Sequence, residues 1–410
     1  MTMPSTDVLV VGAGPAGSAA ATWAARAGHE VLLIDAEQFP RDKTCGDGLT
    51  PRAIAQMQLL GMGPWLADRP RSKGIRMLGF GTEHEVPWNG PHLPHYGSAA
   101  ARAELDDAIR RVAVASGASF QGATRALDVE RAADGRVSAV VVSGPAGVDT
   151  VRCGTLIVAD GVRSTLGRVL GRTWHRDTVY GIAARAYVDS DRHDDAWISS
   201  HLELRDAQGR ALPGYGWIFP LGNGRVNIGV GSLATQRKAG KVNLHALLER
   251  YTVAQRAGFG LGASLHQEAS AMLPMGGAVS NVAGPNWMLI GDAAACVNPL
   301  NGEGIDYGLE TGRLAASQVG AADCTRLWPA LLREHYGADF SIARRLAALL
   351  THDWFLPVFG PLGMRSAHIM AVALRVMGNL VTDEDADLVA RAWRAAGSAS
   401  QRMDARTPWQ

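Results

Sequence analysis

The stretch DVLVVGAGPAG, residues 7–17, decides the fold of this 410-residue chain. Its apolar, β-branched run predicts a strand, and Gly12, Gly14 and Gly17 form a G-x-G-x-x-G turn that leads into a helix from Ala16 to Ala27. Such glycines let the backbone turn sharply, let a pyrophosphate approach and let the helix pack on the strand. The free N–H groups of the first helical turn then favour a phosphate. The sequence therefore predicts a dinucleotide-phosphate site formed by Gly12, Gly14, Pro15, Ala16 and Gly17.

A second strand, from Glu30 to Asp35, strengthens this interpretation. It ends in an acid roughly 20 residues beyond the turn, where a carboxylate accepts the hydroxyl groups of a ribose. A glycine turn without a ligand would give the first motif alone. The added acid favours the nucleotide, with Asp35 as a ligand of its ribose.

Length and composition limit the class of protein. A chain of 410 residues is too long for one ordinary core, so we expect two or more lobes. Hydrophobic residues make up 47% and charged residues 19%, which excludes a mainly disordered chain. The formal charge of +1 gives no indication of a nucleic-acid partner. Four scattered cysteines predict neither a disulfide framework nor a zinc site, and we expect no metal.

The two ends of the chain bear on its location. The first strand starts within about six residues of Met1, too early for a secretory signal, so we expect a cytoplasmic protein. Near the other end, an expected helix from Met364 to Leu380 is strongly apolar and is flanked by Arg365 and Arg375. Its apolar run is shorter than the roughly 18 residues that cross a bilayer. Two interpretations stay open: a helix packed on the protein, or a surface that touches the inner face of the cell membrane.

The pattern of strands predicts a chain that leaves its first lobe and returns. From Tyr180 to Leu233 the sequence becomes β-rich, with strands expected at His201–Leu204, Gly216–Phe219 and Arg225–Val230. A short apolar strand then leads into Gly291 and Asp292, in the style of the first lobe. We expect a first domain of residues 1–75, 97–171 and 275–320, a β-rich domain of residues 76–96 and 172–274, and a C-terminal helical region of residues 321–410.

Several motifs, in this order, resemble those of FAD-dependent oxidoreductases with the p-hydroxybenzoate hydroxylase-like fold, and among them the geranylgeranyl reductase group. The glycine turn and Asp35 match the adenosine site of that family, Asp160-Gly161 match its Asp-Gly motif, and Gly291-Asp292 match its Gly-Asp motif, whose aspartate is implied to bind the ribityl chain. Arg102 lies where the family has an arginine near the cofactor. The resemblance implies an α/β fold with a Rossmann-type FAD-binding domain, an inserted β-rich substrate domain and a C-terminal helical region.

Two segments resemble the reductase group in particular. Residues 43–48, KTCGDG, resemble its Cys-Gly loop beside the isoalloxazine, which implies that Lys43, Cys45 and Gly46 contact the cofactor. Residues 215–220, YGWIFP, resemble its Y-x-W-x-F-P signature, whereas flavin halogenases have W-x-W-x-I-P there. Leu212 departs from the small residue or proline that often precedes the signature.

Strand alternation directs Tyr215, Trp217 and Phe219 to one face. These rings form a wall for an isoprenoid chain or belong to an ordinary core, and the pattern fits both. The loop before a helix expected from Asp306 supplies N–H donors to the flavin through Gly302, Glu303, Gly304 and Ile305. Glu303 is either catalytic or stabilises its own helix. The candidate proton donors are Cys45, Tyr215 and an ordered water, and Cys45 also suits a packing role.

The resemblance also selects a substrate class. Segments 43–52, 212–231 and 289–314 are similar to those of members that saturate one double bond in the isoprenoid tail of menaquinone. The sequence has no second glycine fingerprint, so an external electron donor of unknown identity is expected. The alternatives are an FAD-dependent aromatic monooxygenase, a reductase of another prenyl lipid such as a geranylgeranyl group, and a prenyl-group carrier without flavin.

Overall fold

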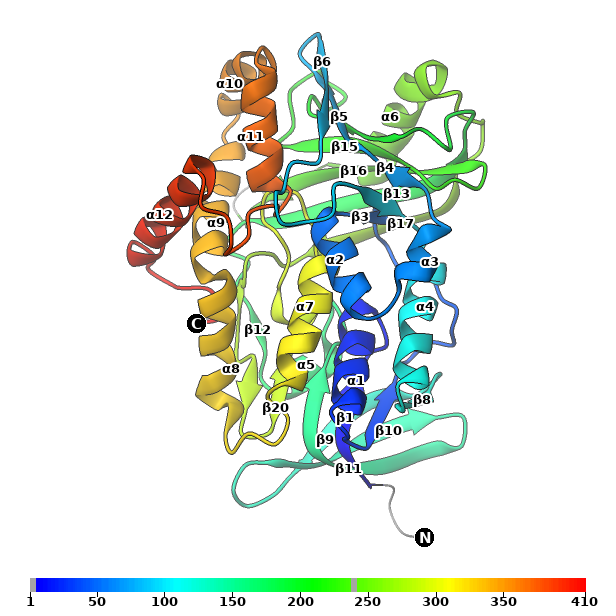
Figure 1. The fold of residues 1–410 in the computed structure, drawn as a ribbon, viewed down its shortest axis with the longest axis vertical. Helices are drawn as coiled ribbons and strands as arrows, with labels where there is room; N and C mark the ends of the chain where they lie inside the picture. Colours follow the sequence, from blue (N-terminus) through cyan, green and yellow to red (C-terminus); the bar gives the residue numbers. More distant parts are fainter. Residues whose placement is uncertain (1–4, 237–241) are drawn as a thin grey trace.

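The computed structural model describes residues 5–236 and 242–410. Figure 1 shows one sheet covered by helices in the lower half, a second sheet above it, and the C-terminal helices along one side. Within the described residues, no helix combines the length and the apolar character needed to cross a membrane. The α/β fold with a β-rich insertion and a helical C-terminal region agrees with the sequence expectation.

The first sheet has the parallel order β20-β11-β1-β2-β8 at its centre. Apolar residues fill its strands because helices cover them, as parallel sheets require. The antiparallel strands β9, β10 and β19 extend it. The strand bounds are β1 Ser5–Val11, β2 Val31–Ile34, β8 Ser119–Gln121, β9 Arg125–Arg131, β10 Val137–Gly144, β11 Gly147–Val158, β19 Ala283–Gly284 and β20 Trp287–Leu289.

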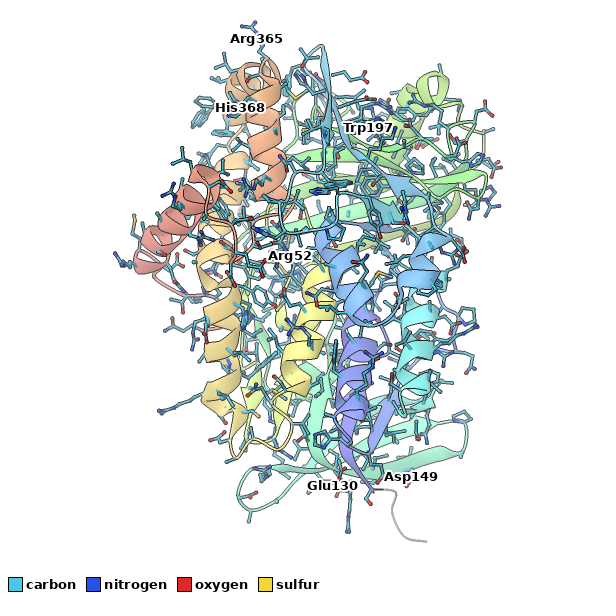
Figure 2. The ribbon with its side chains drawn as sticks, in the orientation of Figure 1. Arg52, Glu130, Asp149, Trp197, Arg365 and His368 are labelled. Carbon is cyan, nitrogen blue, oxygen red and sulfur yellow. The ribbon has the colours of Figure 1, made fainter. Side chains whose placement is uncertain are left out.

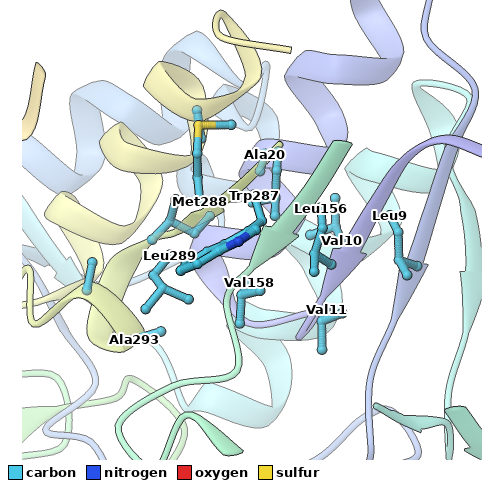
Figure 3. Packing of buried hydrophobic residues seen from close by; sticks show 14 of the residues in the cluster. Leu9, Val10, Val11, Ala20, Leu156, Val158, Trp287, Met288, Leu289 and Ala293 are labelled. Atoms are coloured by element: carbon cyan, nitrogen blue, oxygen red, sulfur yellow. The ribbon is translucent and has the colours of Figure 1, made fainter. Parts of the chain in front are cut away.

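The chain returns to this sheet at β20, as the sequence predicts. Figure 3 shows Trp287 and Leu289 of β20 beside Leu156 and Val158 of β11 in one apolar cluster. These side chains are almost completely buried. The cluster therefore joins a strand near residue 290 to the first strands of the chain.

Three helices, α1 Pro15–Arg26, α4 Arg102–Ala115 and α7 Ile305–Ala316, pack side by side on this sheet (Figure 1). Small residues allow α1 and α7 to approach closely. A Cβ atom added to Gly312 would lie 2.5 Å from the carbonyl oxygen of Ala16. The N-termini of α1 and α7 therefore open at the same edge of the sheet.

The second sheet has seven strands in the order β17-β13-β16-β15-β14-β5-β6, with α6 Leu244–Phe259 packed on it. The boundaries proposed between the lobes stay predictions. The strand bounds are β5 Gly74–Gly79, β6 Thr82–Pro87, β13 Tyr180–Asp189, β14 Trp197–His201, β15 Gly214–Pro220, β16 Arg225–Ala234 and β17 His266–Leu273. Short elements connect the sheets: β3 Gly48–Leu49, α2 Pro51–Leu59, α3 Gly63–Ala67, β4 Arg71–Ser72, β7 Gly97–Ala99, α5 Thr165–Val169, β12 Thr173–Trp174 and β18 Val279–Ser280.

The strand expected at His201–Leu204 is wrong, because β14 ends at His201. The side chain of Glu203 turns to accept the backbone N–H of Phe80 at 2.7 Å, which takes this residue out of the strand pattern. Leu204 is buried in a cluster with Leu247 of α6. Its apolar character therefore reflects contact with a helix.

The C-terminal helices are α8 Cys324–Leu332, α9 Ala338–Leu350, α10 Phe355–Met364, α11 Ala367–Met377 and α12 Leu388–Arg402, with a π-helical turn Arg333–Gly337 between α8 and α9. A helix is present in the segment expected from Met364 to Leu380, but it is shorter, because α11 runs only from Ala367 to Met377. The side chain of Ser366 accepts the backbone N–H of Ile369 at 3.3 Å, so it caps a new helix. Arg375 is also not a surface residue: it is buried and pairs with Asp385 and Asp387 at 3.0 and 2.5 Å.

Candidate functional site

The glycine turn forms a cradle at the N-terminus of α1. A Cβ atom on Gly12 would lie 2.3 Å from the carbonyl oxygen of Ala159, and one on Gly17 would lie 1.8 Å from that of Gly12. By contrast, a Cβ atom on Gly14 would have its nearest neighbour, a guanidinium nitrogen of Arg41, at 3.5 Å. The protein's own packing therefore requires Gly12 and Gly17, whereas Gly14 leaves space that fits a pyrophosphate. Gly14 is also the N-cap of α1 and has no side chain to occupy the N–H groups of the first turn.

Charged side chains surround this cradle. Asp35 Oδ2 accepts the backbone N–H of Ala13 at 2.7 Å, so the predicted ribose ligand also fixes the glycine turn. The fully buried Asp106 accepts two hydrogen bonds from the Arg102 guanidinium, at 2.7 and 2.8 Å, and one from Arg41 at 2.8 Å. Arg41 lies 3.9 Å from Asp35. Sequence analysis missed Arg41 and Asp106, although the i,i+4 spacing of Arg102 and Asp106 is a recognisable signal.

The Asp-Gly motif lies against the same turn, because Ala159 immediately precedes Asp160. Asp160 Oδ2 accepts the backbone N–H of Leu166 at 2.8 Å, and its buried Oδ1 has no partner within the described residues. Burial raises the pKa of Asp160. A guanidinium nitrogen of Arg172 is also buried and unpaired within the described part of the chain. Unsatisfied polar atoms beside a nucleotide cradle are places where a bound cofactor would supply partners.

The Gly-Asp motif meets the cradle from the other side. Lys43 Nζ donates to Asp292 Oδ2 at 2.7 Å. Burial alone would raise the pKa of Asp292, but the charge and hydrogen bond of Lys43, together with the charges of Arg102 and Arg172, lower it. A Cβ atom on Gly291 would lie 2.8 Å from the Cβ atom of Ala16. The structure thus brings Lys43, Gly291 and Asp292 to the start of α1.

The loop before α7 closes this edge. Gly302 has a φ of +77°, and the N-cap of α7, Gly304, makes no side-chain capping bond. Glu303 Oε1 accepts the backbone N–H of Ile305 at 3.2 Å, so its carboxyl group contacts the first turn of its own helix. Burial raises the pKa of Glu303 well above its usual range. The catalytic role considered for Glu303 stays a prediction.

Side chains of strand β13 hold the loop that carries Cys45. Arg185, which is completely buried, donates to both carboxylate oxygens of Asp42 at 2.6 Å and to the carbonyl oxygen of Lys43 at 3.2 Å. Two residues further along β13, the Tyr187 hydroxyl donates to Asp47 Oδ2 at 2.7 Å. The loop is therefore fixed on both sides of Cys45.

Asn227 of β16 links this loop to the aromatic strand. It lies opposite Tyr187 in the sheet register. Its amide nitrogen donates to Asp47 Oδ2 and to the carbonyl oxygen of Cys45, both at 2.9 Å, and its Oδ1 accepts Trp217 Nε1–H at 2.9 Å. Sequence analysis missed Arg185, Tyr187 and Asn227. Their signal is a buried polar side chain inside an otherwise apolar strand.

The three rings of the aromatic strand lie in one row. The ring centroids of Tyr215 and Trp217 are 5.8 Å apart, and those of Trp217 and Phe219 are 6.2 Å apart. Cβ atoms on Gly46 and Gly48 would lie 3.1 and 2.9 Å from the Phe219 ring. The Cys-Gly loop and the Y-x-W-x-F-P strand, about 170 residues apart in sequence, are thus in direct contact.

Burial controls the ionisation of this site. It raises the pKa of the Cys45 thiol, and the nearby Arg102 only partly opposes this effect. It also raises the pKa of Asp47 to about 6. The Tyr215 hydroxyl, whose pKa burial raises as well, donates to the carbonyl oxygen of Asn301 at 2.6 Å. At neutral pH the Cys45 thiol and the Tyr215 phenol are therefore both uncharged.

Comparison with known proteins agrees with this geometry. A family model described as an FAD binding domain matches residues 5–321. The chain is 61% identical over 406 residues to a protein named menaquinone reductase from Mycolicibacterium smegmatis, with 98% of each chain covered. It is 31% identical over 359 residues to digeranylgeranylglycerophospholipid reductase 1 from Methanopyrus kandleri, covering 84% of this chain and 90% of the relative.

A solved structure gives the same fold at low sequence identity. The geranylgeranyl bacteriochlorophyll reductase-like protein of Thermoplasma acidophilum superposes with a TM-score of 0.76 at 21% identity. The superposition covers 96% of this chain and all of that one. The arrangement of sheets and C-terminal helices is therefore shared along almost the whole chain.

Proposed function

This chain belongs to the family of proteins with this FAD-binding domain and, within it, to the menaquinone and geranylgeranyl reductases, and on that premise we propose that it saturates one carbon–carbon double bond in the isoprenoid tail of menaquinone. FAD is its cofactor, and it is a flavin-dependent oxidoreductase. The observation that carries the proposal is 61% identity to a menaquinone reductase along nearly the whole chain. The proposed reaction is a step of menaquinone biosynthesis.

Two observations support the tail, rather than the quinone ring, as the part that is reduced. The archaeal relative is named as a reductase of a geranylgeranyl lipid, which has prenyl chains and a glycerophospholipid head. In addition, the row formed by Tyr215, Trp217 and Phe219 offers an apolar surface directly beside the Cys45 loop. Aromatic rings of this kind suit a hydrocarbon chain.

The residues present fit FAD. The space at Gly14, the N-terminus of α1 and the unpaired atoms of Asp160 and Arg172 provide partners for the pyrophosphate and the ribityl chain. We propose that FAD is contacted by the residues that the sequence analysis predicts to bind it and, in addition, by Arg41. Bound and reduced FAD supplies a hydride for one alkene carbon.

The protein must then deliver a proton to the other alkene carbon. Tyr215 already donates its hydroxyl proton to Asn301, whereas Cys45 Sγ accepts the backbone N–H of Asp47 at 3.3 Å and keeps its own proton for donation. We therefore assign proton donation to Cys45, with solvent restoring the thiol, and a positioning role to Tyr215. Because the thiol is neutral at pH 7, the donor needs no prior protonation.

Two further parts of the proposal concern partners. An external donor supplies the electrons, since the sequence has one glycine fingerprint and no second one for a nicotinamide cofactor. We also propose that the protein is cytoplasmic and makes peripheral contact with the inner face of the cell membrane, because a quinone with a long prenyl tail dissolves in the bilayer.

The test is an anaerobic incubation of dithionite-reduced holoenzyme with menaquinone, followed by oxidation in air before mass spectrometry. Reduction of the tail leaves a product two mass units heavier that air does not reverse. Reduction of the ring alone gives a quinol that air returns to the starting mass, and this result would overturn the proposal. A product that contains added oxygen, formed only when oxygen is present, would identify a monooxygenase instead.

A further inference from the structure

Helix α10 and the start of α11 expose a concentrated apolar surface, hereafter the α10 face: Trp354, Val358, Phe359, Leu362 and Ile369. These side chains are 54%, 50%, 46%, 54% and 50% exposed. Single exposed apolar residues are ordinary, but a group on one helix pair marks an interaction site. Trp354, Phe355 and Phe359 also contact one another, with ring centroids 6.1 Å apart for Trp354–Phe359 and 4.9 Å for Phe355–Phe359.

Charged side chains are few on the α10 face itself, and the exposed Asp353 directly precedes its first residue. Residues 354–382 contain no Asp or Glu. The arginines in this stretch are Arg365 and Arg375, of which Arg375 is buried and paired inside the protein. Figure 2 shows Arg365 projecting beyond the end of the helix pair, with His368 close to it. An apolar, aromatic face with the positive charge of Arg365 at one end suits the interface of a bilayer that contains anionic lipids.

The α10 face is also continuous with the interior of the site. A Cβ atom on Gly360 would lie 2.4 Å from the ring of Phe80, so α10 is seated directly on the β5–β6 hairpin. Phe80, Met364 and Met370 belong to one apolar cluster that also includes Phe219. Phe219 in turn lies against Gly46 and Gly48, which follow Cys45 in the loop. An unbroken apolar layer therefore runs from the exposed helix to the reactive loop.

We infer that the α10 face is the surface by which the protein docks on a lipid bilayer with anionic headgroups. This inference rests on the proposed function, because the apolar layer then lets a prenyl tail pass from the bilayer to the Cys45 loop without crossing water. Helix α10 has 10 residues and is about 15 Å long, so it lies in the interface and does not cross the bilayer. Met364, Met370 and Met77 in the layer have flexible side chains that adapt to a hydrocarbon chain.

The docking test measures flotation of the FAD-loaded protein with phosphatidylcholine vesicles that contain or lack phosphatidylglycerol. Val358→Ser combined with Phe359→Ser should reduce binding at least tenfold. The matched control is Val148→Ser, a 71% exposed valine in the β10–β11 hairpin at the opposite end of the molecule, beside Asp149 in Figure 2. This control should bind like the wild type. Arg365→Gln should lower binding to the anionic vesicles severalfold and leave binding to neutral vesicles unchanged.

Equal flotation of the wild type and the double variant would overturn the inference. So would a wild-type dimer in light scattering that the double variant converts to monomer, because a second copy would then cover the α10 face. Unchanged melting temperature and flavin absorbance show that the variant is folded.

A second assay separates docking from the reaction itself. With a short-tailed menaquinone in detergent micelles, the wild type and the double variant should have the same rate. With a long-tailed menaquinone in vesicles, the double variant should reduce the substrate more slowly than the wild type does. If the wild type reduces neither substrate, the proposed function fails. If it reduces both and the variant matches it in vesicles, docking through the α10 face fails.

Discussion

The two halves of the site are built in opposite ways. The cradle around Gly14 consists of backbone, glycines and helix termini that lie within short sequence motifs. The clamp on the Cys45 loop consists of long side chains, Arg185, Tyr187 and Asn227, from two strands far along the chain. The cradle therefore depends on space that a ligand fills, whereas the clamp depends on hydrogen bonds that the protein makes with itself.

The sharpest test of this comparison lies inside the cradle. Gly17→Ala places a methyl group 1.8 Å from the Gly12 carbonyl oxygen. We expect the first lobe to unfold or its melting temperature to fall by more than 10 °C, since each kcal/mol of lost stability lowers the melting temperature by about 2–4 °C. Gly14→Val meets no such clash from its Cβ atom, so the protein should fold without flavin. Circular dichroism and the flavin absorbance measure the two properties.

Full flavin occupancy in Gly14→Val would contradict the placement of the pyrophosphate. Asp292→Ala serves as an intermediate case, since it removes a predicted ligand of the ribityl chain and frees Lys43. It should weaken flavin retention without abolishing it.

The next largest effect concerns the reactive loop. Cys45→Ala should retain FAD but lower kcat about 10²-fold, in the range typical of a general acid. Single-turnover kinetics with pre-reduced enzyme measure the chemical step directly. Cys45→Ser offers the control, because a hydroxyl group restores a proton donor and should recover part of the rate. If Cys45→Ala retained the full rate, the proton would have to come from water.

Sequence reasoning succeeded where chemistry is carried by neighbours in the chain. Gly12 and Asp35 belong to one motif whose spacing sets their geometry beside α1, whereas the approach of Gly291 to α1 is what the resemblance to the FAD-dependent family implies. The three aromatic residues also share one row because strand alternation is local. The roles of these residues toward the cofactor and the substrate stay predictions.

The same reasoning failed where tertiary contacts decide. Asn227 becomes important only because β16 pairs with β13 and β15, and no short motif records that register. The start of α11 depends on Ser366, whose capping bond sets a boundary inside an apolar run that the sequence pattern extends back to Met364. Arg375 looked like a surface cation because Asp385 and Asp387, its partners, come from the following loop.

A smaller effect distinguishes the two roles of Trp217. Trp217→Phe keeps a ring in the aromatic row but removes the Nε1–H donor to Asn227, so kcat should fall severalfold with KM nearly unchanged. Trp217→Ala should instead raise KM for a long-tailed substrate, because it removes apolar contact area. Steady-state kinetics with short- and long-tailed menaquinones give the split. If the two variants behaved alike, the link between the aromatic row and the Cys45 loop would have no kinetic role.

The last effect, and the one most specific to the clamp, is the pH dependence of stability that Asp47 imposes. Its pKa in the folded protein is about 6, raised by burial from 3.8. Between these values the folded state holds a proton that the unfolded state has lost. The wild type therefore loses stability as the pH rises from about 4 to about 6, by roughly 3 kcal/mol in all. Asp47→Asn cannot titrate, so its melting temperature relative to the wild type should rise over this window and stay constant above it. Asp149→Asn, an exposed aspartate at the far end of the molecule, should show no such trend. A constant difference between wild type and Asp47→Asn across the window would mean that Asp47 is already ionised at pH 4, with Tyr187 and Asn227 outweighing its burial.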